Sequence, residues 1–187
     1  YRSYFQALGN IGTLYTALDK IPEALETYKT LVKEAKERDY NAQLSTGLIG
    51  LAQLYFKLDD YSESLKYNLE AIEVLKALKQ KRYLAVAYSN VADIYKNNQQ
   101  VDSAAFFYNL SFELHQEIKQ LDYQAYVLER WGTMYLNNDQ IDKGLDYINK
   151  GIEIVNQVDS PEDELLLYSA KAKGLMLKGN SGKAIAP

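Results

Sequence analysis

Small residues and tyrosines recur along the chain at a constant spacing of 40 residues. In each segment a small residue is followed three positions later by a tyrosine and twelve positions later by a second small residue. The first small residues are Gly12, Ala52, Ala92 and Gly132, the tyrosines are Tyr15, Tyr55, Tyr95 and Tyr135, and the second small residues are Ala24, Ser64, Ala104 and Gly144. Residues three positions apart share one face of a helix. The pattern predicts repeating helix pairs whose backbones approach closely at the small residues.

Short polar turns separate the two small residues of each segment. The predicted turns are Asp19-Lys20, Asp59-Asp60, Gln99-Gln100, Asp139-Gln140 and Gly179-Asn180. An apolar residue follows most of these turns and begins the second helix, as Ile21 and Val101 do. Pro22 suits a first helical turn, where its missing N–H costs nothing. Ser160-Pro161-Glu162-Asp163 also predicts a helix start, with Ser160 as the N-cap and the acids near the positive end of the helix dipole.

A fifth copy of the pattern is incomplete. Ala172 stands in the first small column, Leu175 replaces the tyrosine and Ala184 stands in the second small column. The repeats run approximately over 5–44, 45–84, 85–124 and 125–164, with a partial repeat at 165–187. Such repeats bury their apolar faces against their neighbours. We therefore expect one repeat array over 1–187 and, since it starts at Tyr1 inside a helix, a fragment of a longer protein.

The pattern resembles the tetratricopeptide repeat (TPR) family, whose small–x–x–Tyr on helix A and small residue early in helix B match in four copies. The period departs from the family's usual length of about 34 residues. The family's proline near the end of helix B is replaced by Lys36, Lys76, Gln116 and Asn156. Variants with 40-residue repeats occur in LGN/Pins-type adaptors and in bacterial TPR signalling proteins. The resemblance implies an all-α fold, a right-handed α-solenoid of antiparallel helix pairs.

The resemblance also implies a binding surface, because the A helices of a TPR superhelix line its concave groove. The residues expected to contact a partner there are Asn10, Gln53, Asn90, Asp93, Glu129 and Arg130. Amide side chains both donate and accept hydrogen bonds, so they can pair with a peptide backbone. The guanidinium of Arg130 suits a carboxylate. The alternative is that these are ordinary solvated residues, with Arg130 paired to Glu129 or Asp93.

Composition narrows the function classes. Hydrophobic residues make up 47% of the chain and charged residues 25%, a globular balance that argues against disorder. No run of apolar residues is long enough to predict a membrane span. The net charge of −4 without a basic stripe argues against nucleic-acid contact by this segment. The absence of cysteine excludes a disulfide framework, a cysteine-ligated metal and a cysteine nucleophile.

No catalytic motif accompanies the repeats. The sequence has no G-x-S-x-G, no glycine-rich phosphate loop and no H-E-x-x-H. His115 is the only histidine, and we interpret it as a packing or surface residue because no catalytic partner accompanies it. Trp131 shares an apolar column with Leu51 and Val91 and is predicted to lie in the core. We expect no enzymatic activity, no metal and no cofactor.

Two functions remain open at this point. The first is a protein–protein interaction scaffold that binds a peptide or partner segment in the concave groove. The second is a sensory or regulatory TPR region of a bacterial signalling protein, with its kinase or transcription-regulator domain outside this chain. Either function is compatible with a homodimer, and the cellular compartment is left open, with the cytoplasm favoured.

Overall fold

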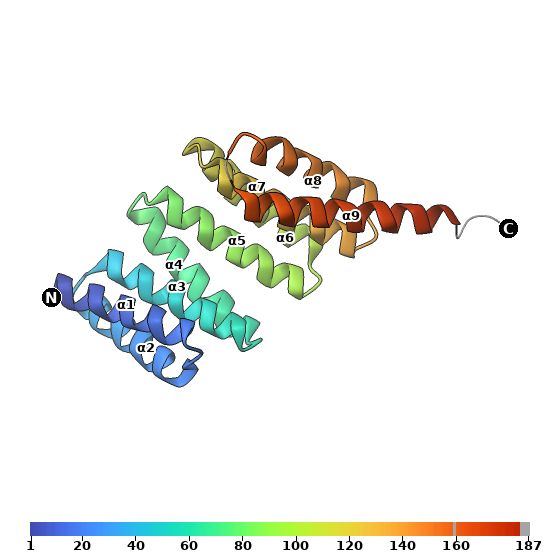
Figure 1. The fold of residues 1–187 in the computed structure, drawn as a ribbon. Coiled ribbons are helices and arrows are strands. Elements are labelled where there is room, and N and C mark those ends of the chain that lie inside the picture. Colours follow the sequence, from blue (N-terminus) through green and yellow to red (C-terminus); the bar gives the residue numbers. More distant parts are fainter. Residues whose placement is uncertain (159, 184–187) are drawn as a thin grey trace. The chain divides into compact units, whose positions relative to one another are not determined.

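The fold consists of helices joined by short turns. The computed structural model describes residues 1–158 and 160–183, in which no strand occurs. The helices, shown in Figure 1, are α1 (Arg2–Ala17), α2 (Ile21–Glu37), α3 (Asn41–Lys57), α4 (Tyr61–Ala77), α5 (Lys81–Asn97), α6 (Val101–Glu117), α7 (Leu121–Asn137), α8 (Ile141–Val155) and α9 (Pro161–Lys183). The predicted all-α helical-repeat fold is confirmed. From α2 to α8 each helix begins 20 residues after the previous one, so a helix pair spans 40 residues.

One turn geometry recurs at this spacing. At the end of α1 the Lys20 amide donates to the Tyr15 carbonyl at 2.9 Å and the Asp19 amide to the Thr16 carbonyl at 3.2 Å. This is the Schellman pattern, which usually places glycine in the left-handed position. Here that position holds Asp19, Asp39, Asp59, Lys79, Gln99, Lys119 and Asp139, with φ between 55° and 59°. The turns therefore close without glycine, which explains why the chain has only 10.

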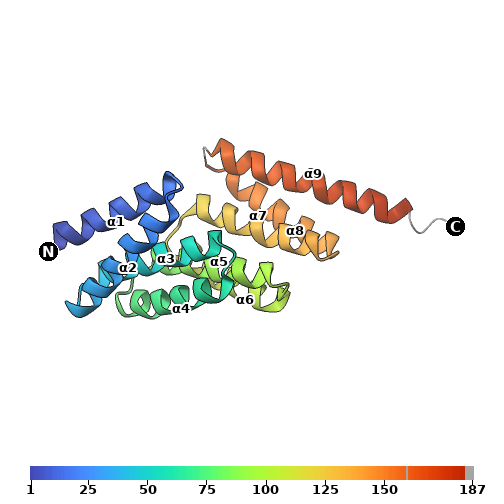
Figure 2. The ribbon, with the colours of Figure 1, turned by 90° about the horizontal axis from the view of Figure 1, so that it is seen from below.

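The helices group into two compact units, residues 1–94 and the residues from Tyr95 onward. In the first unit α1 packs on α2 and α3, α2 packs on α3, and α3 packs on α4. In the second unit α6 packs on α7, and α7, α8 and α9 pack on one another. Figures 1 and 2 both show α1, α2 and α3 side by side. Helix α5 contributes residues 81–94 to the first unit.

The predicted close approach at the small residues is confirmed within both units. In the second unit a Cβ on Gly132 would lie 2.8 Å from the Gly144 carbonyl oxygen, and a Cβ on Gly144 would lie 2.8 Å from that of Gly132. The backbones of α7 and α8 can approach this closely only because neither residue has a side chain. In the first unit the Ser64 hydroxyl donates to the Ala52 carbonyl at 2.8 Å, and both residues are fully buried.

Three of the four repeat tyrosines pack against an aromatic residue of the following B helix. Tyr55 stacks on Tyr67 and Tyr95 stacks on Phe107, while the rings of Tyr135 and Tyr147 are tilted by 36°, and the ring centroids of all three pairs are 5.4–5.5 Å apart. Such offset pairs contribute about 0.5–1.5 kcal/mol beyond their buried area. Burial beside the ring of Tyr55 raises the pKa of the Tyr67 phenol. The column predicted from sequence is therefore a packing column.

The fifth repeat differs from the sequence prediction. Helix α9 begins at Pro161 as expected, and the Ser160 hydroxyl donates to the Asp163 carboxylate at 2.6 Å. The turn predicted at Gly179-Asn180 is wrong, since α9 continues to Lys183. In the earlier repeats a following helix packs back at this point, and none follows α9 in the described residues. Ala184, predicted to start that helix, lies outside them.

Candidate functional site

A hollow of about 450 Å³ opens in the first unit, over α1, α3 and the start of α5. Its lining is rich in side chains that both donate and accept hydrogen bonds. These are Gln6, Thr13, Tyr28, Gln43, Ser45, Thr46, Gln53, Gln80 and Tyr83, with Arg2 as the charged member. Such a surface can pair with the alternating N–H and C=O groups of a peptide backbone. Of the six residues predicted from sequence, only Gln53 lies in this hollow.

Tyr28 belongs to helix α2, which packs on both α1 and α3, and its side chain reaches the hollow. Its ring passes between those helices because Gly12 and Gly50 lack side chains: a Cβ would lie 2.6 Å from the ring at Gly12 and 2.4 Å at Gly50. The Tyr28 hydroxyl lies 3.1 Å from Thr13 Oγ1, which in turn donates to the Gly9 carbonyl at 3.0 Å. The repeat pattern did not indicate that Tyr28 reaches a surface hollow. The signal that could have shown this is the pair of glycines that opens a path for the ring.

The other predicted residues of the first unit lie beside the hollow or below the surface. Asn10 is exposed and accepts a hydrogen bond from Gln6 at 3.2 Å. Asn90 is half-buried, and its amide nitrogen is buried without a hydrogen-bond partner. Asp93 is only 6% exposed. A partner that approaches these A helices can therefore contact Asn10 and Gln53 directly, while Asn90 offers a donor that is not yet used.

In the second unit, Glu129 and Arg130 already have partners on their own helix. The Arg130 guanidinium lies 4.9 Å from the centre of the Tyr126 ring and donates to the Tyr126 hydroxyl. Glu129 accepts a hydrogen bond from Thr133 at 2.8 Å. Both residues are half-buried. These contacts fix the positions of both charged groups on α7. The Tyr126 ring is therefore part of the same surface as Glu129 and Arg130.

The residues considered for chemistry are packing residues. His115 is 1% exposed, stacks on Tyr123 with ring centroids 5.0 Å apart, and has its Nδ1 3.1 Å from Gln120 Oε1. Trp131 is 6% exposed, and its ring centroid lies 4.3 Å from that of Tyr147. Within residues 1–158 and 160–183, no cluster of acidic or histidine side chains has the grouping that a metal ion needs. No helix in these ranges is long and apolar enough to cross a membrane.

Comparison with known families finds one match, in the first unit. A family model described as tetratricopeptide repeat matches residues 3–77, which cover helices α1 to α4. These residues match tetratricopeptide repeats, and helices α5 to α8 continue the same 20-residue spacing. TPR arrays are protein-interaction modules, and the coarse function that follows is binding of protein partners. The 20-residue helix spacing agrees with a 40-residue TPR, while membership of the LGN or bacterial signalling subgroup stays a prediction.

Solved structures share this fold at low sequence identity. The TPR-like repeats of a kinesin light chain from Podosopora anserina are 13% identical, with a TM-score of 0.78 over 98% of this chain and 91% of that one. BtubC (BKLC) from P. vanneervenii is 16% identical, with a TM-score of 0.83 over 96% and 74%. Aspartyl phosphate phosphatase F from Bacillus subtilis is 17% identical, with a TM-score of 0.84 over 98% and 48%. No curated protein sequence matches the chain.

Proposed function

We propose that this TPR chain binds an extended peptide or partner segment along its A helices and catalyses no reaction. The contact residues in the proposal are Asn10, Gln53, Asn90, Asp93, Glu129 and Arg130. The observation that carries it is the 450 Å³ hollow of the first unit, in which amides and hydroxyls surround Gln53. A peptide backbone laid there exchanges hydrogen bonds with water for hydrogen bonds with these side chains.

Two further features support contacts outside the hollow. The unpartnered amide nitrogen of Asn90 gains a hydrogen bond if a peptide carbonyl reaches it, and a buried donor without a partner costs about 1–3 kcal/mol. Arg130 is held over the Tyr126 ring, which orients its guanidinium for a carboxylate. The negative charge of Asp93 lies just below the surface and would attract a cationic group of the peptide.

The proposal is tested by selecting ligands from a displayed library of random peptides with the wild-type chain as bait. The selected peptide is then titrated calorimetrically against two variants, Q6A/Q53A in the hollow and N90A/R130A outside it. Each variant removes two hydrogen-bonding side chains, so we expect the Kd to rise about tenfold in each, since a lost hydrogen bond costs about 0.5–1.5 kcal/mol.

A matched control replaces two exposed polar side chains on B helices. Gln116 lies on α6 and Asn149 on α8, and both are exposed. We expect Q116A/N149A to leave the Kd unchanged and the helix content of all three variants to match that of the wild type. If the groove variants bind as tightly as this control, the residues are assigned wrongly. If no peptide is selected, peptide binding itself is wrong.

A second candidate, the sensory or regulatory region of a bacterial signalling protein, is favoured by the likeness to aspartyl phosphate phosphatase F, of which this chain spans about half the length. In that case the peptide would act as an input that changes the activity of an attached domain. A kinase or DNA-binding domain encoded next to this segment would support the second candidate. Further repeats followed by short binding motifs would support an adaptor.

A further inference from the structure

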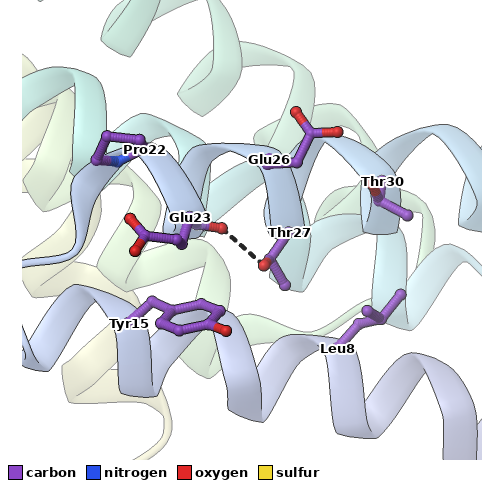
Figure 3. A pocket seen from close by; sticks show the side chains of 7 residues that line it. All are labelled: Leu8, Tyr15, Pro22, Glu23, Glu26, Thr27 and Thr30. Atoms are coloured by element: carbon purple, nitrogen blue, oxygen red, sulfur yellow. Dashed lines mark hydrogen bonds between the residues drawn. The ribbon is translucent and has the colours of Figure 1, made fainter.

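A second hollow, of about 480 Å³, lies between α1 and α2 and is separate from the proposed peptide groove. Leu8 and Tyr15 line it from α1, and Glu23, Glu26 and Thr27 line it from α2 (Figure 3). We call it the Tyr15 slot. Figure 3 shows the Tyr15 ring facing Glu23 and Thr27 across the gap between the two helices. The slot thus combines the apolar side chains of α1 with two carboxylates of α2.

The other repeats show what the fold places in this position. Thr27 corresponds, at 40-residue steps, to three aromatic residues. These are Tyr67, Phe107 and Tyr147, each of which packs its ring against the tyrosine of its own repeat, stacked in the first two and tilted in the third. Thr27 cannot replace such a ring, because it is small and its hydroxyl donates to the Glu23 carbonyl at 2.7 Å. The Tyr15 slot is therefore the position of an aromatic ring that repeat 1 does not supply.

Repeat 2 also carries an ion pair beside its aromatic ring. Lys66 Nζ lies 5.1 Å from the centre of the Tyr67 ring and 2.9 Å from a Glu63 carboxylate oxygen. In repeat 1 the position of Glu63 is kept as Glu23, but that of Lys66 is occupied by Glu26. The slot therefore has two carboxylates where repeat 2 has an ion pair, and neither carboxylate forms an ion pair within the described residues. The Nζ of Lys20 lies 5.9 Å from the Tyr15 ring centroid.

We propose that the Tyr15 slot binds an aromatic side chain of a partner peptide that has a lysine or arginine next to the aromatic residue. The aromatic ring stacks on Tyr15, as Tyr67 stacks on Tyr55. The neighbouring cation pairs with Glu23 and Glu26, as Lys66 pairs with Glu63. The partner thus supplies both groups that repeat 2 carries itself. Aromatic stacking and a cation over a ring are each favourable at a half-exposed site.

The experiment uses the acetylated and amidated peptide Gly-Lys-Tyr-Gly as its probe. Amide chemical shifts of the full ¹⁵N-labelled chain are followed during titration, and we expect saturable shifts at Tyr15, Glu23 and Thr27. The matched peptide with alanine in place of tyrosine should cause no saturable shift. The peptide with glutamate in place of lysine should bind about threefold more weakly or worse, because an exposed ion pair contributes about 0.2–1 kcal/mol.

Two reciprocal variants test whether the Tyr15 slot is where the probe peptide binds. The variant E26K/T27Y builds the repeat 2 arrangement into repeat 1, so we expect it to abolish probe binding. The variant K66E/Y67T builds the repeat 1 arrangement into repeat 2, so we expect new probe-dependent shifts at Tyr55. Circular dichroism verifies that the helix content is unchanged. If K66E/Y67T loses helix content, E26K/T27Y alone decides.

Several outcomes overturn the proposal. These are no shifts in the wild-type chain, equal binding of the alanine peptide, or probe binding that survives in E26K/T27Y. Dimerisation that E26K/T27Y abolishes would assign the slot to a second copy of the chain instead of a peptide. The variant Q6A/Q53A should bind the probe normally, so a failure of the proposed groove is distinguishable from a failure of the slot.

Discussion

Helices α1 and α3 have the same pattern of apolar residues 40 positions apart, yet they differ in what they bury. Ile11 and Leu14 on α1 are 41% and 57% exposed, whereas the corresponding Leu51 and Leu54 on α3 are 1% and 0% exposed. Helix α2 covers this face of α3: a Cβ on Gly47 would lie 2.8 Å from a methyl group of Val32 and 3.2 Å from Leu31. In the described residues no helix covers the face of α1. The same apolar pattern is therefore core in one helix and surface in the other.

The largest difference in stability is expected when the two corresponding leucines, Leu14 and Leu54, are truncated to alanine. We expect Leu54→Ala to lower the free energy of unfolding by about 2–5 kcal/mol, because it leaves a cavity in a fully packed site. Leu14→Ala should change it by no more than about 0.5 kcal/mol, because the side chain is mostly in water already. Urea denaturation followed by circular dichroism measures both. Equal losses would mean that the face of α1 is covered in solution.

A smaller effect is expected from two glycines, Gly50 on α3 and Gly9 on α1, that meet different surroundings. Gly50→Ala would place a methyl group 2.4 Å from the Tyr28 ring, and such overpacking costs about 1–3 kcal/mol. Gly9→Ala would meet its nearest atom, a Thr46 methyl, at 3.4 Å, an ordinary contact. Alanine is favoured over glycine within a helix by about 0.5–1 kcal/mol, so Gly9→Ala should stabilise the chain. The same denaturation experiment measures the signs, and a stabilised Gly50→Ala would contradict the assigned path of the Tyr28 ring.

The smallest effect is expected at the ion pair that links the two repeats. Lys57 at the end of α3 lies 2.6 Å from Asp19, with side chains 50% and 76% exposed. Lys57→Gln should lower the free energy of unfolding by less than about 1 kcal/mol, since exposed pairs are weak. High salt should remove the difference between variant and wild type, because screening acts strongly on exposed charges. A larger loss that persists in salt would show that Lys57 contributes through packing.

Much of the fold could be predicted because the repeat encodes it locally. The turns at Asp19 and Asp59, the small residues at 132 and 144, and the burial of Trp131 all follow from short-range spacing. The site was less predictable. Spacing on a helix indicates which residues share a face, but it did not show that Asp93 is buried or that Tyr28 reaches the hollow between two glycines.

The helices, their 20-residue spacing and the columns of small and aromatic residues could be read from the order of residues alone, because turn geometry and helical periodicity depend on residues that are close along the chain. The covered apolar faces, the positions of the hollows and the continuation of α9 through Gly179 became visible only in the packed structure. Those outcomes depend on which helix packs against which. Thr27 illustrates this dependence. The sequence shows that repeat 1 has a threonine where the other repeats have an aromatic residue, but only the packed helices show the open slot beside Tyr15.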